Sequence, residues 1–176
     1  MVELQTERLN LIPLSPAQLL LCLERPAQLE QQLEMPISRA IITERVQRAI
    51  RMKLAKMVHV EEARWPWYTY WLLVIRAGPF GAGLAGFKGC PNEDGEVEIG
   101  YGIDPAYQRQ GYMTEAVQRL IAWAFEEPAC LSVVAIDVAR SNLASQRVLA
   151  KVGMEVYQES EDGMCFRVER GNTGSS

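Results

Sequence analysis

Residues 104–116 read DPAYQRQGYMTEA, and this stretch joins a strand-like segment to the clearest helix of the chain. Before it, residues 96–103 alternate glutamate or glycine with valine, isoleucine or tyrosine, a period of two that predicts a strand. After it, residues 114–127 place apolar side chains three and four apart, which predicts an amphipathic helix. Because such a loop turns successive backbone N–H groups toward one point, the stretch predicts an anion-binding connection between strand and helix.

Three features of the loop favour an anion. The start of the helix offers unpaired N–H groups and the positive end of the helix dipole. Gly111 lets the backbone approach a ligand without a Cβ in the way, and Arg109 adds a positive charge. A phosphate or pyrophosphate is therefore the preferred ligand. The loop alone leaves a second interpretation open, an ordinary connection with a solvated arginine.

A second glycine pattern, Gly81-x-Gly83-x-x-Gly86, has the spacing of a dinucleotide-binding fingerprint. That fingerprint binds pyrophosphate only where a helix follows the glycines, because the phosphates rest on the N-terminus of the helix. Here residues 87–91 read FKGCP, and turn residues follow them. We therefore interpret the pattern as a glycine-rich strand.

The rest of the chain supplies strands and helices on either side of the loop. Strands are predicted over residues 9–14, 65–75, 80–89, 131–138, 154–158 and 164–169. Helices are predicted from Ser15 onward, over residues 43–58 and over residues 142–152. The order is strand, two helices, three strands, helix, strand, helix and two strands, which predicts a mixed sheet covered by helices. We expect one domain over residues 1–170 and a polar tail over residues 171–176.

The composition narrows the class of protein. The chain of 176 residues fits one domain that needs no disulfide or metal to fold. Its formal net charge of -4 disfavours a nucleic-acid partner but leaves room for a local basic patch. His59 is the only histidine and the 4 cysteines form no CxxC pair, which disfavours both a metal site and a Cys–His nucleophile. Without a signal-peptide pattern or an apolar run of ~20 residues, we expect a cytoplasmic protein with no membrane contact.

The loop and its surroundings resemble a known family. Gln108-x-x-Gly111-x-Met113 is similar to the acetyl-CoA loop of the GNAT acetyltransferases, Q/R-x-x-G-x-G/A, with Met113 in place of the usual small residue. Other segments resemble the ribosomal-protein-acetylating branch of that superfamily: TERL at residues 6–9, EIGY at 98–101, GYMTEA at 111–116 and NxxSxxVLxKxG at 142–153. The resemblance runs from about Thr6 to Arg167 and is weakest between residues 19 and 64.

The resemblance implies a single-domain α/β fold with a mixed, mostly antiparallel sheet flanked by helices. Its central parallel strands, expected at residues 98–103 and 133–138, would splay apart and admit acetyl-CoA as cosubstrate, with the pyrophosphate on the amides of residues 108–113. The implied binding residues are Ile103, Gln108, Arg109, Gln110, Gly111, Tyr112, Met113, Thr114, Asn142 and Ser145. No metal is implied.

The implied reaction moves an acetyl group from acetyl-CoA to a primary amine by direct attack in a ternary complex. The acceptor would be a protein N-terminus, an amino acid or a small amine, and the enzyme a monomer or a homodimer. The implied catalytic groups are the Glu98 carboxylate as general base, the backbone N–H of Tyr101 as oxyanion donor and the Ser145 hydroxyl as proton donor to the thiolate. Glu96 is the fallback base, and Leu149 occupies the position where many relatives have a proton-donating tyrosine.

Each of these side chains also has an ordinary structural explanation. Glu98 can be an ion-paired strand carboxylate, Ser145 a helix-surface serine and Asn142 a helix N-cap. The competing function is a non-catalytic acyl-CoA-binding or sensor protein on the same fold. An ATP-binding loop is disfavoured, because the sequence has no P-loop lysine pattern and no evident magnesium ligands.

Two segments are candidates for the wall of the acceptor site. Residues 65–71 read WPWYTYW, and such an aromatic run forms either a binding wall or, more commonly, strand core. Glu61 and Glu62 would attract a cationic amine, unless they are simply a solvated helix end.

Overall fold

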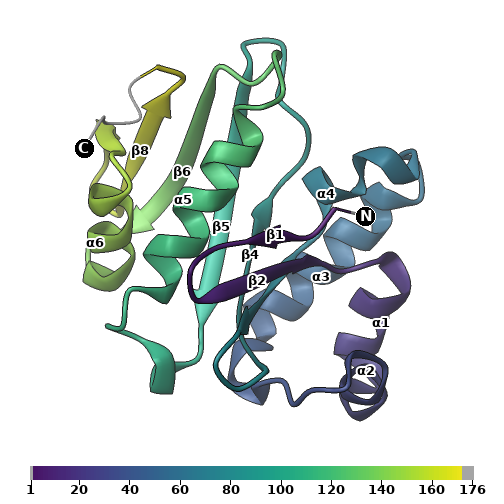
Figure 1. The fold of residues 1–176 in the computed structure, drawn as a ribbon. Helices are drawn as coiled ribbons and strands as arrows, with labels where there is room; N and C mark the ends of the chain where they lie inside the picture. Colours follow the sequence, from purple (N-terminus) through teal and green to yellow (C-terminus); the bar gives the residue numbers. More distant parts are fainter. Residues whose placement is uncertain (1, 172–176) are drawn as a thin grey trace.

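A computed structural model describes residues 2–171 of the chain (Figure 1), so residues 172–176 of the expected tail lie outside the described residues. One sheet contains all the described strands, in the order β1-β2-β3-β4-β5-β6-β8-β7. Their bounds are β1 (Leu4–Gln5), β2 (Leu9–Pro13), β3 (Trp71–Ile75), β4 (Phe80–Phe87), β5 (Glu96–Ile103), β6 (Ser132–Ala139), β7 (Glu155–Glu159) and β8 (Gly163–Glu169). Neighbouring strands are antiparallel except β5 and β6, which confirms the mixed, mostly antiparallel sheet.

Helices cover both faces of this sheet (Figure 1). They are α1 (Pro16–Glu24), α2 (Pro26–Leu33), α3 (Glu44–Met57), α4 (Trp65–Tyr68), α5 (Tyr112–Ala124) and α6 (Leu143–Lys151). The apolar stripe of α5 and Leu149 of α6 pack on one face, while α1, α2 and α3 pack on the other. Strand β3 serves both cores, since Trp71 and Leu73 face α5 whereas Leu72 and Val74 face α3. Within residues 2–171, every helix falls short of the length and apolarity that crossing a membrane requires.

Two predictions about the first half of the chain were wrong. Residues 65–68 form the short helix α4 instead of the start of a strand, because Pro66 occupies its first turn, where the missing N–H does no harm. The Trp71 indole donates to the Pro66 carbonyl (3.0 Å) and ties the helix to the strand that follows. Helix α2 was not predicted at all, although Pro26 at its first turn marks its start in the same way.

The central strands splay apart, as the resemblance implied. Strands β5 and β6 pair only at Glu96–Ser132, Val97–Val133 and Glu98–Val134. Beyond these pairs β5 continues along β4 as far as Ile103, and β6 continues along β8 as far as Ala139. A β-bulge between Ala135 and Val138, with Asp137 in a left-handed conformation (φ 53°), bends β6 at the point where the strands part.

The G-x-G-x-x-G pattern lies within strand β4, which confirms the interpretation as a glycine-rich strand. A Cβ on Gly83 would lie 2.8 Å from the Gly102 carbonyl oxygen of β5, and one on Gly86 would clash with the Thr69 carbonyl oxygen. These glycines therefore allow close backbone approach between β4 and its neighbours, rather than the binding of a nucleotide.

Candidate active site

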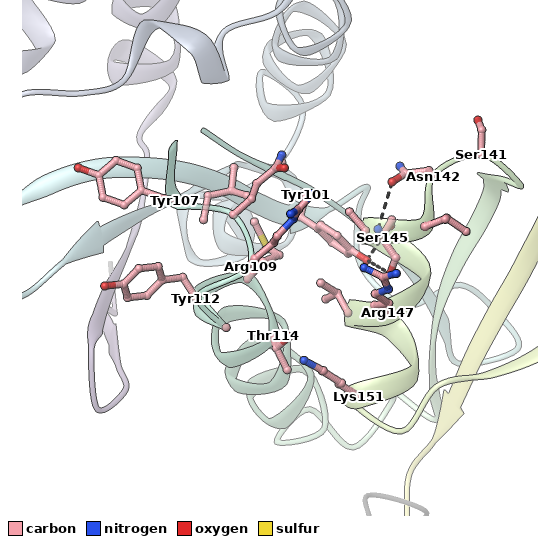
Figure 2. Close-up of a pocket in the computed structure, with 18 residues that line it drawn as sticks. Tyr101, Tyr107, Arg109, Tyr112, Thr114, Ser141, Asn142, Ser145, Arg147 and Lys151 are labelled. Carbon is pink, nitrogen blue, oxygen red and sulfur yellow. Dashed lines mark hydrogen bonds between the residues drawn. The ribbon is translucent and has the colours of Figure 1, made fainter. Parts of the chain in front are cut away.

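Two cavities meet where β5 and β6 diverge. The first, of about 740 Å³, lies between the loop before α5 and the helix α6, and Figure 2 shows the side chains around it. The second, of about 550 Å³, lies between α3 and the open ends of β5 and β6. Because α5 and α3 cover opposite faces of the sheet, the cavities open on opposite faces. Both are lined by Tyr101, Gly102, Ile103, Asn142 and Ser145.

The loop before α5 has the backbone of an anion-binding turn. Arg109 (φ 61°) and Gly111 (φ 82°) are left-handed, whereas Gln110 between them is not. Such alternation directs successive N–H groups toward one point. Gly111 is also the N-cap of α5 and has no side chain to cap it, so the first-turn amides remain available to a ligand. Helix α5 begins at Tyr112, two residues earlier than predicted, so that its N-terminus forms the end of the loop.

The first cavity carries positive charge and no carboxylate. Its cationic side chains are Arg109 of the loop and Arg147 and Lys151 of α6, and its lining contains no aspartate or glutamate (Figure 2). The sequence interpretation missed Arg147 and Lys151, although their spacing of four places them on one face of a helix. Two or more phosphates at the N-terminus of α5 fit this charge distribution.

Most of the predicted binding residues line this cavity. They are Ile103, Gln108, Arg109, Gly111, Tyr112, Met113, Thr114, Asn142 and Ser145. Gln110 does not line it: its side-chain amide donates to the Ala106 carbonyl (3.2 Å). The Met113 side chain is only 6% exposed and packs in the core beneath α5, which explains how the loop accommodates a large residue at this position.

An N-terminal clamp holds the loop and the start of α5 together. Arg8 donates through Nε to Glu115 (2.7 Å) and through Nη1 to the Gln110 carbonyl (2.8 Å), and its guanidinium lies over the Tyr112 ring (4.5 Å). The Thr6 hydroxyl also donates to Glu115. Partial burial raises the pKa of Glu115, but the hydrogen bonds from Thr6 and Arg8 outweigh it and hold that pKa below its usual value. The TERL motif at residues 6–9 thus has a structural task that the sequence interpretation did not assign.

The hydroxyls of Tyr101 and Ser145 meet at the junction of the cavities. Their oxygens lie 2.9 Å apart, and Figure 2 draws this hydrogen bond. Burial raises the pKa of the Tyr101 phenol to about 12, although the hydrogen bond with Ser145 opposes the shift. Asn142 caps α6, accepting from the Ser145 backbone N–H (3.1 Å). Sequence reasoning singled out the Tyr101 backbone and missed the side chain, which contacts α6 through Ser145.

The backbone of β5 directs every second amide toward the gap. The Lys88 N–H donates to the Glu98 carbonyl, and the Asp104 N–H donates to the Ala82 carbonyl. In this antiparallel ladder the even-numbered residues of β5 therefore bond to β4, and the odd-numbered residues turn their N–H and C=O groups toward β6. Beyond Glu98 that side is the open gap, so the Tyr101 N–H faces it.

The two candidate bases lie in different surroundings. Glu98 lines the second cavity and is ion-paired through Oε1 with Lys88. Glu96 lines neither cavity and is paired with Arg167 (2.6 Å) on β8. Gly100 and Gly102 share the Glu98 face of β5, and a Cβ on either would meet nothing within 4 Å. The geometry therefore favours Glu98 over Glu96.

The two proposed acceptor-wall segments behave differently. Trp67 and Trp71 pack against Trp123, tilted and edge-on respectively, with ring centroids 4.5 and 5.2 Å apart, while Tyr70 lines the second cavity. Glu61 and Glu62 are exposed and line neither cavity. Within residues 2–171, no three His, Cys, Asp or Glu side chains gather in a way that could hold a metal ion.

A mixed sheet with a splayed parallel pair and an anion-binding loop at its mouth defines the acetyltransferase class of α/β folds. The chain belongs to the GNAT acetyltransferase family: the family model of the acetyltransferase (GNAT) domain matches residues 8–155.

Individual relatives agree with this assignment. A Bacillus subtilis protein, described as the uncharacterized N-acetyltransferase YjdG, is 34% identical over 95 residues, which are 54% of this chain and 56% of the relative. The match thus spans about half the length of that protein. Among solved structures, the ribosomal-protein-S5-alanine acetyltransferase of Vibrio fischeri is 18% identical with a TM-score of 0.66, covering 99% of this chain and 100% of its own. The ribosomal-protein acetyltransferase RimL, solved with coenzyme A, is 16% identical with a TM-score of 0.61, covering 96% and 98%. At these identities the two structures show the fold alone.

Proposed function

We propose that this protein transfers an acetyl group from acetyl-CoA to a primary amine, which is a protein N-terminus, an amino acid or a small amine, by direct attack in a ternary complex. The observation that carries the proposal is the junction of two cavities where β5 and β6 separate. One cavity suits a long phosphorylated cosubstrate, and the other offers separate access for the amine. Both reactants can therefore occupy the protein at once, which places amine and thioester in reach of each other and supplies much of the rate enhancement.

The residues of the first cavity fit acetyl-CoA, which supplies an acetyl thioester when bound. The loop amides, the N-terminus of α5 and the cations Arg109, Arg147 and Lys151 would hold the phosphates. The odd-numbered amides and carbonyls of β5 would pair with the pantetheine arm as a further strand does. The Asn142 side chain caps α6 through its oxygen, which leaves its NH₂ group to donate to that arm. RimL, which shares the fold, was solved in complex with coenzyme A, in keeping with this proposal.

Three groups of the chain would carry the chemistry. The Tyr101 N–H, directed into the gap, would donate to the oxyanion that develops during attack. Glu98, with Oε1 paired to Lys88, has Oε2 to accept a proton from the amine, directly or through a water.

The Ser145 hydroxyl would protonate the departing thiolate, and Tyr101 would supply the next proton along their shared hydrogen bond. Because the pKa of Tyr101 is raised to about 12, its phenol is fully protonated at neutral pH and is available as a donor. This pair would replace the tyrosine that the resemblance implies at the position of Leu149.

Free-thiol release from acetyl-CoA in the presence of a panel of primary amines tests the proposal. We expect amine-dependent release, together with measurable coenzyme A affinity by calorimetry. Affinity without release across a broad panel would identify an acyl-CoA-binding sensor instead. Absence of affinity would overturn both functions.

A further inference from the structure

The second cavity is basic although the protein as a whole is acidic. The chain has a formal net charge of -4. The ionisable side chains that line this cavity are nonetheless mostly basic, with five basic residues, Arg45, Arg48, Lys53, Lys56 and Lys88, against two acidic ones, Glu98 and Asp137. A charge so unlike that of the rest of the molecule concentrates an attractive potential for anions inside one concave site.

Helix α3 supplies the two arginines that are free to bind a ligand. Arg45 and Arg48 are exposed and three residues apart, so they lie on one face of the helix with Met52 and Lys56, which also line the cavity. Neither arginine forms an ion pair or a side-chain hydrogen bond with any residue between 2 and 171. The other cations are engaged: Lys88 pairs with Glu98, and Lys56 donates to the Lys88 carbonyl (3.0 Å).

Lys53 is part of the wall rather than a ligand-binding group. Its Nζ lies within hydrogen-bond distance of the carbonyls of Tyr68 (3.3 Å), Thr69 (3.2 Å) and Phe87 (2.6 Å), and when protonated it has all three of its protons taken by these acceptors. An anion in the cavity would therefore be held by Arg45 and Arg48, whose planar guanidinium groups suit bidentate pairing with a carboxylate.

We propose that the acceptor amine carries a carboxylate close to the amino group, and that Arg45 and Arg48 bind this carboxylate while the amine lies at Tyr101 and Ser145. The inference rests on the proposed acetyl transfer and specifies its acceptor class. The same charges disfavour polyamines and lysine-rich peptides, because a second cation in the cavity would meet like charge. The carboxylate has two possible sources, the α-carboxylate of a free amino acid or an acidic side chain that follows a peptide N-terminus.

Matched pairs of acceptors test this proposal. Each pair keeps the amine and changes one charge: an amino acid against its amide, and a short peptide with aspartate at positions 2 and 3 against the same peptide with asparagine. We expect kcat/KM for the carboxylate member of at least one pair to be higher by about tenfold or more, a factor that corresponds to one charge-assisted hydrogen bond. The pair that shows the preference identifies the source of the carboxylate, and the preference should shrink as salt is added.

Variants of α3 separate this inference from general effects on the enzyme. Arg45→Gln with Arg48→Gln should bring the ratio within each pair close to one, and Arg48→Glu should favour the uncharged member. The matched control is Arg51→Gln, since Arg51 is an exposed arginine of the same helix that does not line the cavity. A different result is that the unmodified protein turns over both members of every pair with nearly equal kcat/KM. That result would overturn the inference but leave the proposed acetyl transfer intact.

Binding of the acetylated products covers the case in which no amine is turned over. With coenzyme A present, calorimetry would compare an N-acetylamino acid with its amide. Tighter binding of the carboxylate ligand, lost in the double variant but not in Arg51→Gln, would support the anion site, while the absence of turnover would contradict the enzyme. Equal affinity for the two ligands would overturn the anion site.

Discussion

At the scale of single residues, the side chain of Tyr101 has a proposed role that its place in the sequence did not indicate. It stands at the junction of the two cavities, its hydroxyl 2.9 Å from Ser145. A tyrosine at the position of Leu149 would reach the thiolate from α6, whereas Tyr101 reaches the same helix from β5. Ser145 would thus protonate the thiolate from the helix, and the tyrosine hydroxyl that supplies the next proton would come from the strand.

This arrangement predicts the effect of removing one hydroxyl. Tyr101→Phe keeps the ring and should lower kcat by about 10²-fold, with the KM for acetyl-CoA little changed, because a proton donor acts on the transition state and not on binding. Ser145→Ala should have a similar effect, and the double variant should be little worse than either single one, because the two hydroxyls act in series. Steady-state kinetics at saturating amine measure this. Fully additive losses would argue against a shared proton path.

The position of several side chains in the candidate site was predictable from sequence, and that of others was not. Glu98, Asn142 and Ser145 line the cavities because strand alternation and helix spacing place them there. Glu98 pairs with Lys88, which follows β4, and Glu96 pairs with Arg167 of β8. No local sequence pattern predicts such contacts between distant parts of the chain. The same holds for the Tyr101 hydroxyl, whose neighbour lies 44 residues away.

At the scale of elements, the start of α5 is held by the N-terminal clamp of Thr6 and Arg8. Arg8→Ala removes the bond to the Gln110 carbonyl and the pairing with Glu115. We expect a KM for acetyl-CoA raised by roughly tenfold with kcat changed much less, because the clamp positions the loop and does not touch the reacting atoms. Calorimetric titration with coenzyme A provides the same comparison without turnover.

The matched control for this prediction lies on the same helix. Arg119 pairs with Glu126 (3.6 Å) near the other end of α5 and does not line either cavity. Arg119→Ala should leave both the KM for acetyl-CoA and the coenzyme A affinity unchanged. An equal loss in the two variants would point to general destabilisation of α5 instead of a clamp.

Strand β5 makes a prediction for amide exchange. Its even-numbered amides bond to β4, whereas those of Tyr101 and Ile103 face the gap. Hydrogen–deuterium exchange followed by NMR should therefore show faster exchange at residues 101 and 103 than at residues 100 and 102. Coenzyme A should slow the two odd-numbered amides most. Uniform protection along the strand without ligand would contradict an open gap.

Sequence periodicity was most reliable for these elements where one face is buried. It gave β5 its observed bounds and located α3 and α6 closely. It failed for residues 65–68, where four aromatic and proline residues have no alternation that separates a helix from a strand, and tertiary contacts to Trp123 decide. The splay coincides with the bulge at Asp137, which no local sequence pattern predicts.

For the molecule as a whole, Lys53 joins three parts of the fold. From its place on α3, its Nζ donates to carbonyls at the end of α4 and of β4. Lys53→Met keeps a side chain of similar length but leaves these carbonyls without their donor. We expect the free energy of unfolding to fall by about 1–3 kcal/mol, measured by urea denaturation.

The pH dependence of that difference follows from the titration of Lys53. Burial lowers its pKa from 10.5 to about 7. Between these values the unfolded chain binds a proton that the folded chain does not, so the stability of the wild type should rise with pH across this window. This pH-dependent contribution of Lys53 to the stability decreases as the pH falls from 10.5 and is lost as the pH falls through about 7. The difference in unfolding free energy between wild type and Lys53→Met should thus increase between pH 6 and pH 9. A difference that does not change with pH would contradict the lowered pKa of Lys53.

The approach of two cavities from opposite sides of one sheet also affects inhibitor design. A bisubstrate compound, in which coenzyme A is joined to a carboxylate-bearing amine, would span the gap between β5 and β6 and fill both cavities at once. Because its two parts would be held on opposite faces of the sheet and either part could rebind while the other stays bound, we expect it to dissociate more slowly than coenzyme A or the amine alone.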